Sequence, residues 1–530
     1  MGSIVRKKIG NQIYLYESHS YRNEEGKPRT RRKLVGKIDP SSGEPIFKSE
    51  YLEEMASSGQ QIKPPSVEPM FSVVAIKNST VRELGVYYLF EQIAENSGLL
   101  NTLKETFPYR WKQIFNLACY IVASGEPLLY CEDWISKTEC IPSQSMASQR
   151  ISELFQSISV DERMAFYENW AKFRCEQEYL ALDITSISSY SELISDIEWG
   201  YNRDKEKLPQ INLCLLMGEK TRLPVFQATY SGSISDVSTL KTTLSLASNI
   251  PLAKTTIVTD KGFCKAKNIN DLLTDKAGFK FLMAMTFSLK FTKDQVANEK
   301  ADIDRVENTI VLGDDVFRGI TRECVWNKKH KIFAHIYCDI AHVTQARDKL
   351  YGRIAKLIEL ASDNPNDAGH LADFTKYLII NKSDEGTSSS PLIQIRHDVV
   401  NDELRHIGWL VLVSNNISDA REAITIYRAK DVVEKGFMRM KNCLDLARLR
   451  VHSDNAMQNK VFVGFIALII MSYIHNTMSE KDIYKNLTMK SLLKVLEKLR
   501  VQYVNGSRIL FPVTKQQKDI FDAFDFDYPL

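Results

Sequence analysis

The sequence lacks the features of a secreted, disulfide-stabilised or zinc-stabilised protein. Its nine cysteines are an odd number and include no Cys-x-x-Cys pair. This count excludes a fully paired disulfide framework and argues against a structural zinc site. The stretch from Met1 to Gly10 is basic and has no apolar core, unlike a signal peptide. We therefore expect a reduced, cytoplasmic protein.

Bilayer-length apolar runs, internal repeats and low-complexity tracts are also missing. The longest apolar run, from about Val461 to Ile474, is too short to span a bilayer and is typical of a buried helix. Hydrophobic residues make up 44% of the 530 residues and charged residues 25%, which is enough apolar surface for several domains. The composition indicates a globular protein.

Charge of one sign is not in large excess, since the formal net charge is only +3. Its distribution is more informative. Residues 1–36 contain nine Lys or Arg against three Glu, and residues 427–450 contain seven against three acids. Both segments are candidates for contact with phosphates, with a solvated basic surface as the alternative for each.

The stretch from Tyr427 to Lys441 is predicted to be an amphipathic helix. At about 100° per residue, Tyr427, Lys430, Glu434 and Lys441 fall on one face. The apolar stripe beside this face consists of Ile426, Val433, Phe437, Met440 and Leu444. A carboxylate flanked by a phenol and two ammonium groups suits a phosphate backbone near a metal-bound carboxylate. The alternative is a solvated helix in which Lys430 and Glu434 form an i,i+4 pair.

Two aspartates are predicted to end buried strands. Asp183 ends an apolar run that begins at Glu178, and Asp260 follows the run from Thr255 to Thr259. Carboxylates at the C-terminal ends of strands face the rim of a sheet, where sites in α/β folds form. With Glu434 they would supply the hard oxygen ligands that Mg²⁺ prefers. A single Asp at the end of a strand is more often a turn or cap residue.

The spacing of Tyr427, Lys430, Glu434 and Lys441 resembles the Tyr-Arg-Glu-Lys signature of DDE transposases of the bacterial insertion-sequence class that includes the Tn-five-like enzymes. Lys430 stands where that family usually has Arg, which keeps the charge but loses the bidentate fork. The resemblance implies that Asp183, Asp260 and Glu434 hold two Mg²⁺ ions, with Mn²⁺ able to substitute. Asp183 would be the bridging ligand.

The resemblance also implies a function and partners. The protein would be a transposase of an insertion sequence, working at the bacterial nucleoid. It would bind the terminal inverted repeats of its element, hydrolyse the DNA strand at the element ends and join the 3′-hydroxyl ends to target DNA. A homodimer would form on the DNA. A nuclease that cuts without joining and a non-catalytic DNA-binding derivative remain as alternatives.

Four residues are expected to contact DNA on the same grounds: Tyr427, Lys430, Lys441 and Trp409. Trp409 lies eighteen residues before Tyr427, at about the place where hairpin-forming relatives carry a tryptophan that stacks on a flipped base. A buried position on an apolar strand explains this tryptophan at least as well.

The predicted fold class is α/β, with an RNase H-like core that carries a β-rich insertion. Three strand patterns followed by alternating helix and strand favour this class. The basic N-terminal hairpin, with Tyr14 and Tyr16, suits either contact with a DNA backbone or a small structural sheet. The predicted segments are a basic β module (1–50), a linker (51–75), a helical DNA end-binding domain (76–178), the core (179–290), the insertion (291–404), the second core segment (405–450) and a C-terminal helical region for oligomerisation (451–530).

Overall fold

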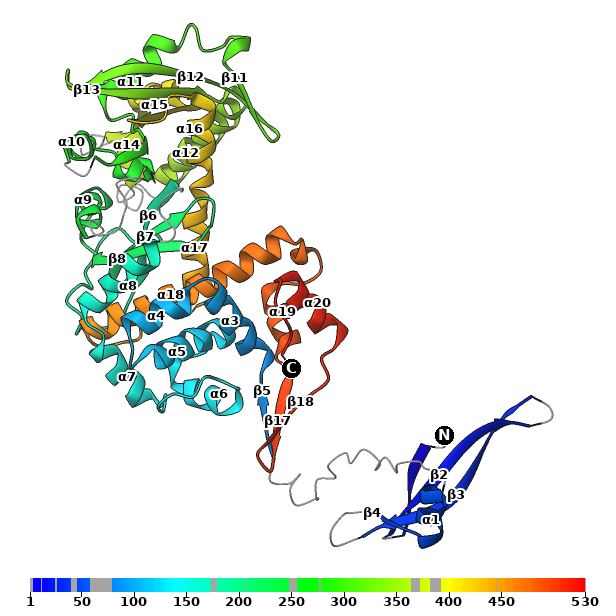
Figure 1. The fold of residues 1–530 in the computed structure, drawn as a ribbon. Helices are drawn as coiled ribbons and strands as arrows, with labels where there is room; N and C mark the ends of the chain where they lie inside the picture. Colours follow the sequence, from blue (N-terminus) through cyan, green and yellow to red (C-terminus); the bar gives the residue numbers. More distant parts are fainter. Residues whose placement is uncertain are drawn as a thin grey trace. The chain divides into compact units, whose positions relative to one another are not determined.

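The structure is a computed structural model, and it describes residues 3–10, 12–23, 26–39, 45–57, 79–172, 179–204, 206–246, 255–275, 278–363, 372–381, 392–444 and 446–529 (Figure 1). The chain divides into two units. One consists of residues 1–80 with 503–509, and the other of residues 81–502 with 510–530.

The N-terminal part of the first unit is a four-stranded antiparallel sheet in the order β1-β2-β3-β4. Its elements are β1 (Ser3–Ile9), β2 (Gln12–Arg22), β3 (Pro28–Ile38), β4 (Pro45–Phe47) and the helix α1 (Ser49–Ser57). Leu15, Val35 and Tyr51 are buried between the sheet and α1. The helix occupies the first residues of the expected linker, and residues 58–75 of that linker lie outside the described part of the chain.

A helical block opens the second unit, where the sequence predicts a helical domain over residues 76–178. Its elements are β5 (Thr80–Glu83), α3 (Gly85–Asn96), α4 (Leu99–Thr106), α5 (Trp111–Ser124), η1 (Leu128–Tyr130), α6 (Cys131–Lys137), α7 (Ser148–Ser157) and α8 (Val160–Lys172). Their apolar faces pack around α18 (Asp454–Glu480), whose central residues are fully buried. The core of this unit is therefore shared by segments more than 300 residues apart in the chain.

A nine-stranded mixed sheet occupies the rest of the second unit, in the order β11-β12-β13-β16-β10-β9-β6-β7-β8. The five strands from β10 to the β8 edge are β6 (Tyr179–Ser188), β7 (Gln210–Gly218), β8 (Pro224–Ser231), β9 (Thr256–Thr259) and β10 (Lys280–Ala284). The helices α9 (Asp236–Leu246) and α10 (Ala266–Thr274) lie between β8 and β9 and between β9 and β10. Strands β6, β9 and β10 are parallel, whereas β6, β7 and β8 pair antiparallel. Three antiparallel strands followed by parallel ones are consistent with an RNase H-like core.

In its described residues, the segment expected as a β-rich insertion contains more helix than strand. Its elements are α11 (Lys290–Glu299), η6 (Val306–Asn308), β11 (Thr309–Leu312), β12 (Asp315–Trp326), β13 (His330–Cys338), α12 (Ile340–Asp363), α14 (Ala372–Tyr377), β14 (Leu378–Asn381), β15 (Leu392–Ile395) and α15 (His397–His406). Strands β11 to β13 extend the main sheet, because β13 pairs with β16 (Trp409–Ser414). These strands thus continue the core sheet.

The prediction of one helix over residues 427–441 was wrong. The structure has α16 (Ala420–Ala429) and α17 (Asp431–Asn442), with Lys430 between them. The amide of Lys430 donates to the carbonyl of Tyr427, and that of Val433 to the carbonyl of Lys430, so the chain tightens locally to i,i+3 bonds. No Pro marks this break, and the apolar stripe runs on through it. In Figure 1 the two helices form one column.

Helices α16 and α17 pack on one face of the sheet. Apolar side chains of α16 pack against Val258 and Leu282 of β9 and β10, and α17 lies on β6 and β7. A Cβ at Gly436 would stand 3.1 Å from side-chain atoms of Leu215 and Met217. This glycine therefore lets α17 approach β7 closely, at a cost of about 1 kcal/mol in helix propensity.

The chain ends with elements that follow α18. They are η7 (Ile483–Lys485), α19 (Met489–Leu496), β17 (Arg500–Val504), β18 (Ser507–Leu510) and α20 (Lys515–Ala523). The helix α18 has 27 residues, more than its apolar run suggested, and it has the length and hydropathy of a membrane span. The helix α5 and the segment Leu128–Lys137 would meet the same test if that bent pair were one span. The most apolar window of α18 is 78% buried in the fold, as in the core helix of a soluble protein.

Candidate active site

The sheet brings Asp183 and Asp260 to neighbouring positions. Leu182 of β6 pairs with Thr259 of β9 in parallel register, so the two aspartates are the next residues on adjacent strands. Asp260 follows the end of β9, as predicted. The prediction that Asp183 ends its strand was wrong, because β6 continues to Ser188. The last residues of β6 are buried and pair with β7. The prediction ended the strand too early because small polar residues in this part of the sequence resemble a loop.

Both aspartates lie on the face of the sheet that α16 and α17 cover. Asp183 pairs with Leu215, the residue against which Gly436 packs. Val258 of β9 packs with the apolar side chains of α16. Asp260 follows Val258 by two residues, and because side chains alternate along a strand, the two side chains point to the same face. The candidate carboxylates thus face the two helices that carry Tyr427, Lys430 and Glu434.

Asp183 is half-buried, and its surroundings disfavour a negative charge. Its Oδ1 accepts a hydrogen bond from the amide of Ile184 at 2.8 Å. Burial raises the pKa of Asp183 to about 6, and the negative charge of Asp260 acts in the same direction, against the opposing effects of the Ile184 amide, Arg203 and Lys430. A carboxylate of this kind attracts a cation.

Asp260 has more hydrogen-bond donors than Asp183. Its Oδ1 accepts from the amide of Lys261 at 2.7 Å and from the hydroxyl of Tyr427 at 2.8 Å. Burial alone would raise the pKa of Asp260, but Tyr427, Lys430 and the Lys261 amide together hold it below its ordinary value. Burial and the charge of Asp260 raise the pKa of Tyr427, so the phenol remains a donor at neutral pH.

Lys430 and Glu434 complete the cluster from the helix side. The Lys430 side chain is 8% exposed, and its Nζ donates to Glu434 Oε1 at 3.2 Å. The Glu434 side chain itself is 61% exposed. The ammonium of Lys430 also acts on the pKa values of Asp183 and Asp260. One buried cation therefore interacts with all three candidate carboxylates.

Lys441 contributes at the other end of α17. Its Nζ lies 2.6 Å from Asp204 Oδ2, in the connection between β6 and β7. The same connection carries Arg203, whose amide donates to Ser186 Oγ at 2.9 Å and whose charge lowers the pKa of Asp183. Neither Arg203 nor Asp204 was predicted from the sequence to belong to the site. Their charged run after Gly200 was the available signal.

Trp409, the first residue of β16, is half-buried beside the cluster. It lines a pocket of about 510 Å³ together with Asp260, Tyr427, Phe287 and Met285. The pocket is therefore continuous with the candidate site and has an aromatic wall.

The donor set fits a divalent cation in its chemistry. Two adjacent carboxylates of like charge, one of them disfavoured as an anion by burial, would be stabilised by such an ion. The arrangement is less complete than the sequence predicts: within the described ranges no three His, Cys, Asp or Glu side chains are grouped closely enough to hold a metal. Glu434 pairs with Lys430.

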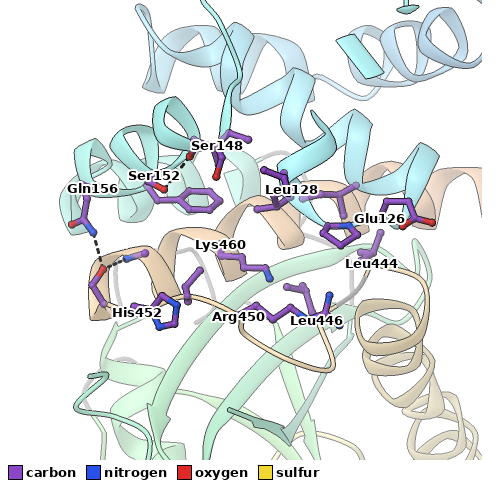
Figure 2. Close-up of a pocket in the computed structure, with 18 of the residues that line it drawn as sticks. Glu126, Leu128, Ser148, Ser152, Gln156, Leu444, Leu446, Arg450, His452 and Lys460 are labelled. Atoms are coloured by element: carbon purple, nitrogen blue, oxygen red, sulfur yellow. Dashed lines mark hydrogen bonds between the residues drawn. The ribbon is translucent and has the colours of Figure 1, made fainter. Parts of the chain in front are cut away.

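A larger cavity of about 580 Å³ lies between α5, α7 and the segment that leads from α17 into α18 (Figure 2). Its polar lining includes Arg450, His452 and Lys460, and Gln156 donates to Ser453 Oγ at its edge. None of the candidate carboxylates lines it.

Comparison with known protein families identifies the class of protein. The family model described as "Transposase DDE domain" matches residues 174–470, more than half of the chain. This range contains Asp183, Asp260 and Glu434. The chain belongs to the DDE transposase family, whose catalysis is DNA cleavage and strand transfer.

No curated protein matches the sequence. Among solved structures, the chain is similar to the structure titled "Cryo-EM structure of piggyBac transposase synaptic complex with hairpin DNA", with 11% identity and a TM-score of 0.33 over 77% of this chain and 70% of that one. A similarity at this level adds nothing to the assignment.

Proposed function

We propose that this transposase is of the insertion-sequence class with the Tyr-Arg-Glu-Lys signature, and that Asp183, Asp260 and Glu434 are its catalytic carboxylates. It would bind the ends of its own element, cleave them and join the 3′-hydroxyl ends to target DNA, as a dimer on the DNA in the bacterial cytoplasm. The observation that carries the proposal is the register of β6 and β9, which sets Asp183 beside Asp260 on the face covered by the Glu434 helix.

Asp183 and Asp260 would hold Mg²⁺ or Mn²⁺, and Glu434 would add the third carboxylate. A divalent ion bound there supplies Lewis-acid chemistry for phosphoryl transfer. Tyr427 fixes Asp260 through its hydroxyl, and Lys430 provides a buried positive charge for a scissile phosphate. Lys441 holds the β6–β7 connection against α17 through Asp204.

Trp409 would accept a flipped base in the pocket that it shares with Asp260 and Tyr427. A cavity of about 510 Å³ exceeds the volume of one nucleobase. The aromatic ring gives a stacking surface within the same pocket as a candidate carboxylate. This arrangement supports the stacking role over a purely structural one.

The basic sheet of the first unit would contact the DNA backbone. Lys7, Tyr14 and Lys37 form a cross-strand row over β1, β2 and β3, with both lysines exposed. A phenol between two ammonium groups offers hydrogen bonds and positive charge to phosphates. Binding through this row would weaken steeply with salt.

The test is cleavage and joining of a labelled duplex that carries the element's own ends, with Mg²⁺, by the wild type and Glu434→Gln. We expect the variant to lose both products by at least about 10³-fold while binding the duplex as tightly as the wild type. A product joined through the 3′-hydroxyl distinguishes a transposase from a nuclease that only cuts.

Asp431→Asn is the matched control. Asp431 is an exposed carboxylate in the first turn of α17 and pairs with Lys435 at 2.7 Å, so its loss should leave both products unchanged. Equal activity of Glu434→Gln and wild type would show that Glu434 is not a metal ligand.

A further inference from the structure

Three large aromatic side chains in the connection between β6 and β7 are exposed to solvent. Tyr190 is 75% exposed, Trp199 67% and Tyr201 85%. Side chains of this size are usually buried at least in part, and their exposure together marks a contact surface.

The backbone under Trp199 and Tyr201 is fixed. The amides and carbonyls of Glu198 and Gln210 bond to each other in both directions at 3.0 Å, and the Glu198 carboxylate accepts from Ser231 and Ser233. The fully buried Gln210 donates to the carbonyl of Tyr201 at 2.9 Å. The two aromatic rings are therefore presented by a segment that needs no ordering before it binds.

Gly200, between the two aromatics, permits this packing. A Cβ at Gly200 would lie 1.9 Å from the carbonyl oxygen of Gly232, and one at Gly232 would lie 2.2 Å from that of Gln210. The two backbones thus touch directly, and the side chains of Trp199 and Tyr201 extend away from the contact.

The aromatic segment leads straight into the candidate active site. Arg203 follows Tyr201 by two residues and is bonded through its amide to Ser186 of β6, the strand of Asp183. The next residue, Asp204, pairs with Lys441 of α17. The aromatics are followed directly by Asn202, Arg203 and Asp204, so rings, an amide and charged groups lie within one short stretch. This mixture suits bases and phosphates better than the apolar surface of another protein.

We propose that Trp199 and Tyr201 form a platform on which unpaired nucleobases stack when a DNA strand lies at the Asp183–Asp260 site. The inference rests on the proposed function, since it takes DNA as the substrate. It adds a contact for unpaired bases of that strand. This contact is separate from the Trp409 pocket, which lies beside Asp260 and Tyr427.

The experiment compares the affinity of the full chain for two labelled probes of mixed sequence: a blunt duplex, and the same duplex with a short unpaired 3′ tail. We expect Trp199→Ala with Tyr201→Ala to weaken binding of the tailed probe by about tenfold or more, because stacking on an aromatic ring contributes roughly 1–3 kcal/mol per base. Binding of the blunt duplex should not change. The double Phe variant should keep most of the tailed-probe affinity, since it keeps both rings.

Tyr351→Ala is the control for loss of an exposed aromatic ring, because Tyr351 is 49% exposed on α12. Equal affinities of wild type and double Ala variant for the tailed probe would overturn the platform, as would an equal loss for both probes. Neither result bears on the catalytic role of the carboxylates, which is tested separately by Glu434→Gln. Conversely, full activity of Glu434→Gln would leave the stacking measurement interpretable as DNA binding.

Discussion

Asp183 and Asp260 are neighbours on parallel strands, yet their pKa values shift in opposite directions. Burial raises the pKa of Asp183 to about 6 with one amide donor as compensation. Asp260 is also partly buried, but a hydroxyl and an amide donate to it and its pKa falls. The pKa values differ because Asp260 lies just past the end of its strand. There the amide of Lys261, in the turn, and the hydroxyl of Tyr427 can both donate to its carboxylate.

The contrast indicates a division of roles within one pair of carboxylates. Asp260 is a stabilised anion that the protein holds in place by itself. Asp183 is an anion that the protein leaves incompletely compensated, as expected of a residue that gains its partner on binding a cation. Of the two, Asp183 is the carboxylate that a nearby cation would stabilise more.

The largest effect on stability is expected from Asp183→Asn without divalent cations. Because the folded-state pKa is raised, the contribution of this carboxyl to stability is fully present below its ordinary pKa and is lost as pH rises through about 6. The variant should therefore increase the free energy of unfolding at pH 7 on the order of 1–3 kcal/mol. The amide bond from Ile184 can be kept by the Asn oxygen.

Urea unfolding at about pH 4.5 and 7 measures this difference, which should be smaller at the lower pH. Asp431→Asn, at an exposed carboxylate of α17, should stay within about 0.5 kcal/mol of the wild type at both. Destabilisation of Asp183→Asn at pH 7 would mean that Asp183 is already compensated, and the contrast with Asp260 would be lost.

Tyr427→Phe should act on Asp260 in the opposite sense. Because the folded-state pKa of Asp260 is lowered, its anion stabilises the fold above the ordinary pKa, and this contribution disappears as pH falls. Loss of the phenol donor should cost about 1–2 kcal/mol at neutral pH. The cost should shrink as pH falls through the lowered pKa of Asp260, because the carboxylate then takes up a proton.

Tyr179→Phe is the matched control for a lost phenol. Tyr179 donates to Glu422 at 3.1 Å at the surface, so its removal should cost only a few tenths of a kcal/mol. An equal loss in free energy of unfolding for the two variants at neutral pH would show that the Tyr427–Asp260 bond stabilises the fold no more than a surface hydrogen bond does.

The sequence predicts the strands and the position of Asp260, because apolar runs and the Lys261–Gly262 turn are local signals. It does not predict the length of β6. Ser186 and Ser188 resemble loop residues, yet both are buried, and their hydroxyls bond to Arg203, Asn202 and Glu206 of the following connection. Their partners come from the tertiary fold, so no local pattern could show them.

The signature residues illustrate the same limit. Their spacing predicts that Tyr427, Lys430, Glu434 and Lys441 share a face, but it does not show the tightening at Lys430 that separates α16 from α17. Nor does it show that Lys430 is buried while Glu434 is exposed. Burial depends on how closely α17 approaches β7, which Gly436 decides.

The smallest expected effect concerns the coupling of Lys430 to Glu434. Because the glutamate is largely exposed, solvent screens the pair, and a double-mutant cycle of Lys430→Met and Glu434→Gln should give a coupling of only a few tenths of a kcal/mol in unfolding. Lys430→Met alone should still raise the pKa of both aspartates, since the buried ammonium lowers both. A coupling above about 2 kcal/mol would place Glu434 among the groups that the fold holds firmly. The site would then have three fixed carboxylates, whereas a weak coupling leaves Glu434 free to exchange Lys430 for another cation.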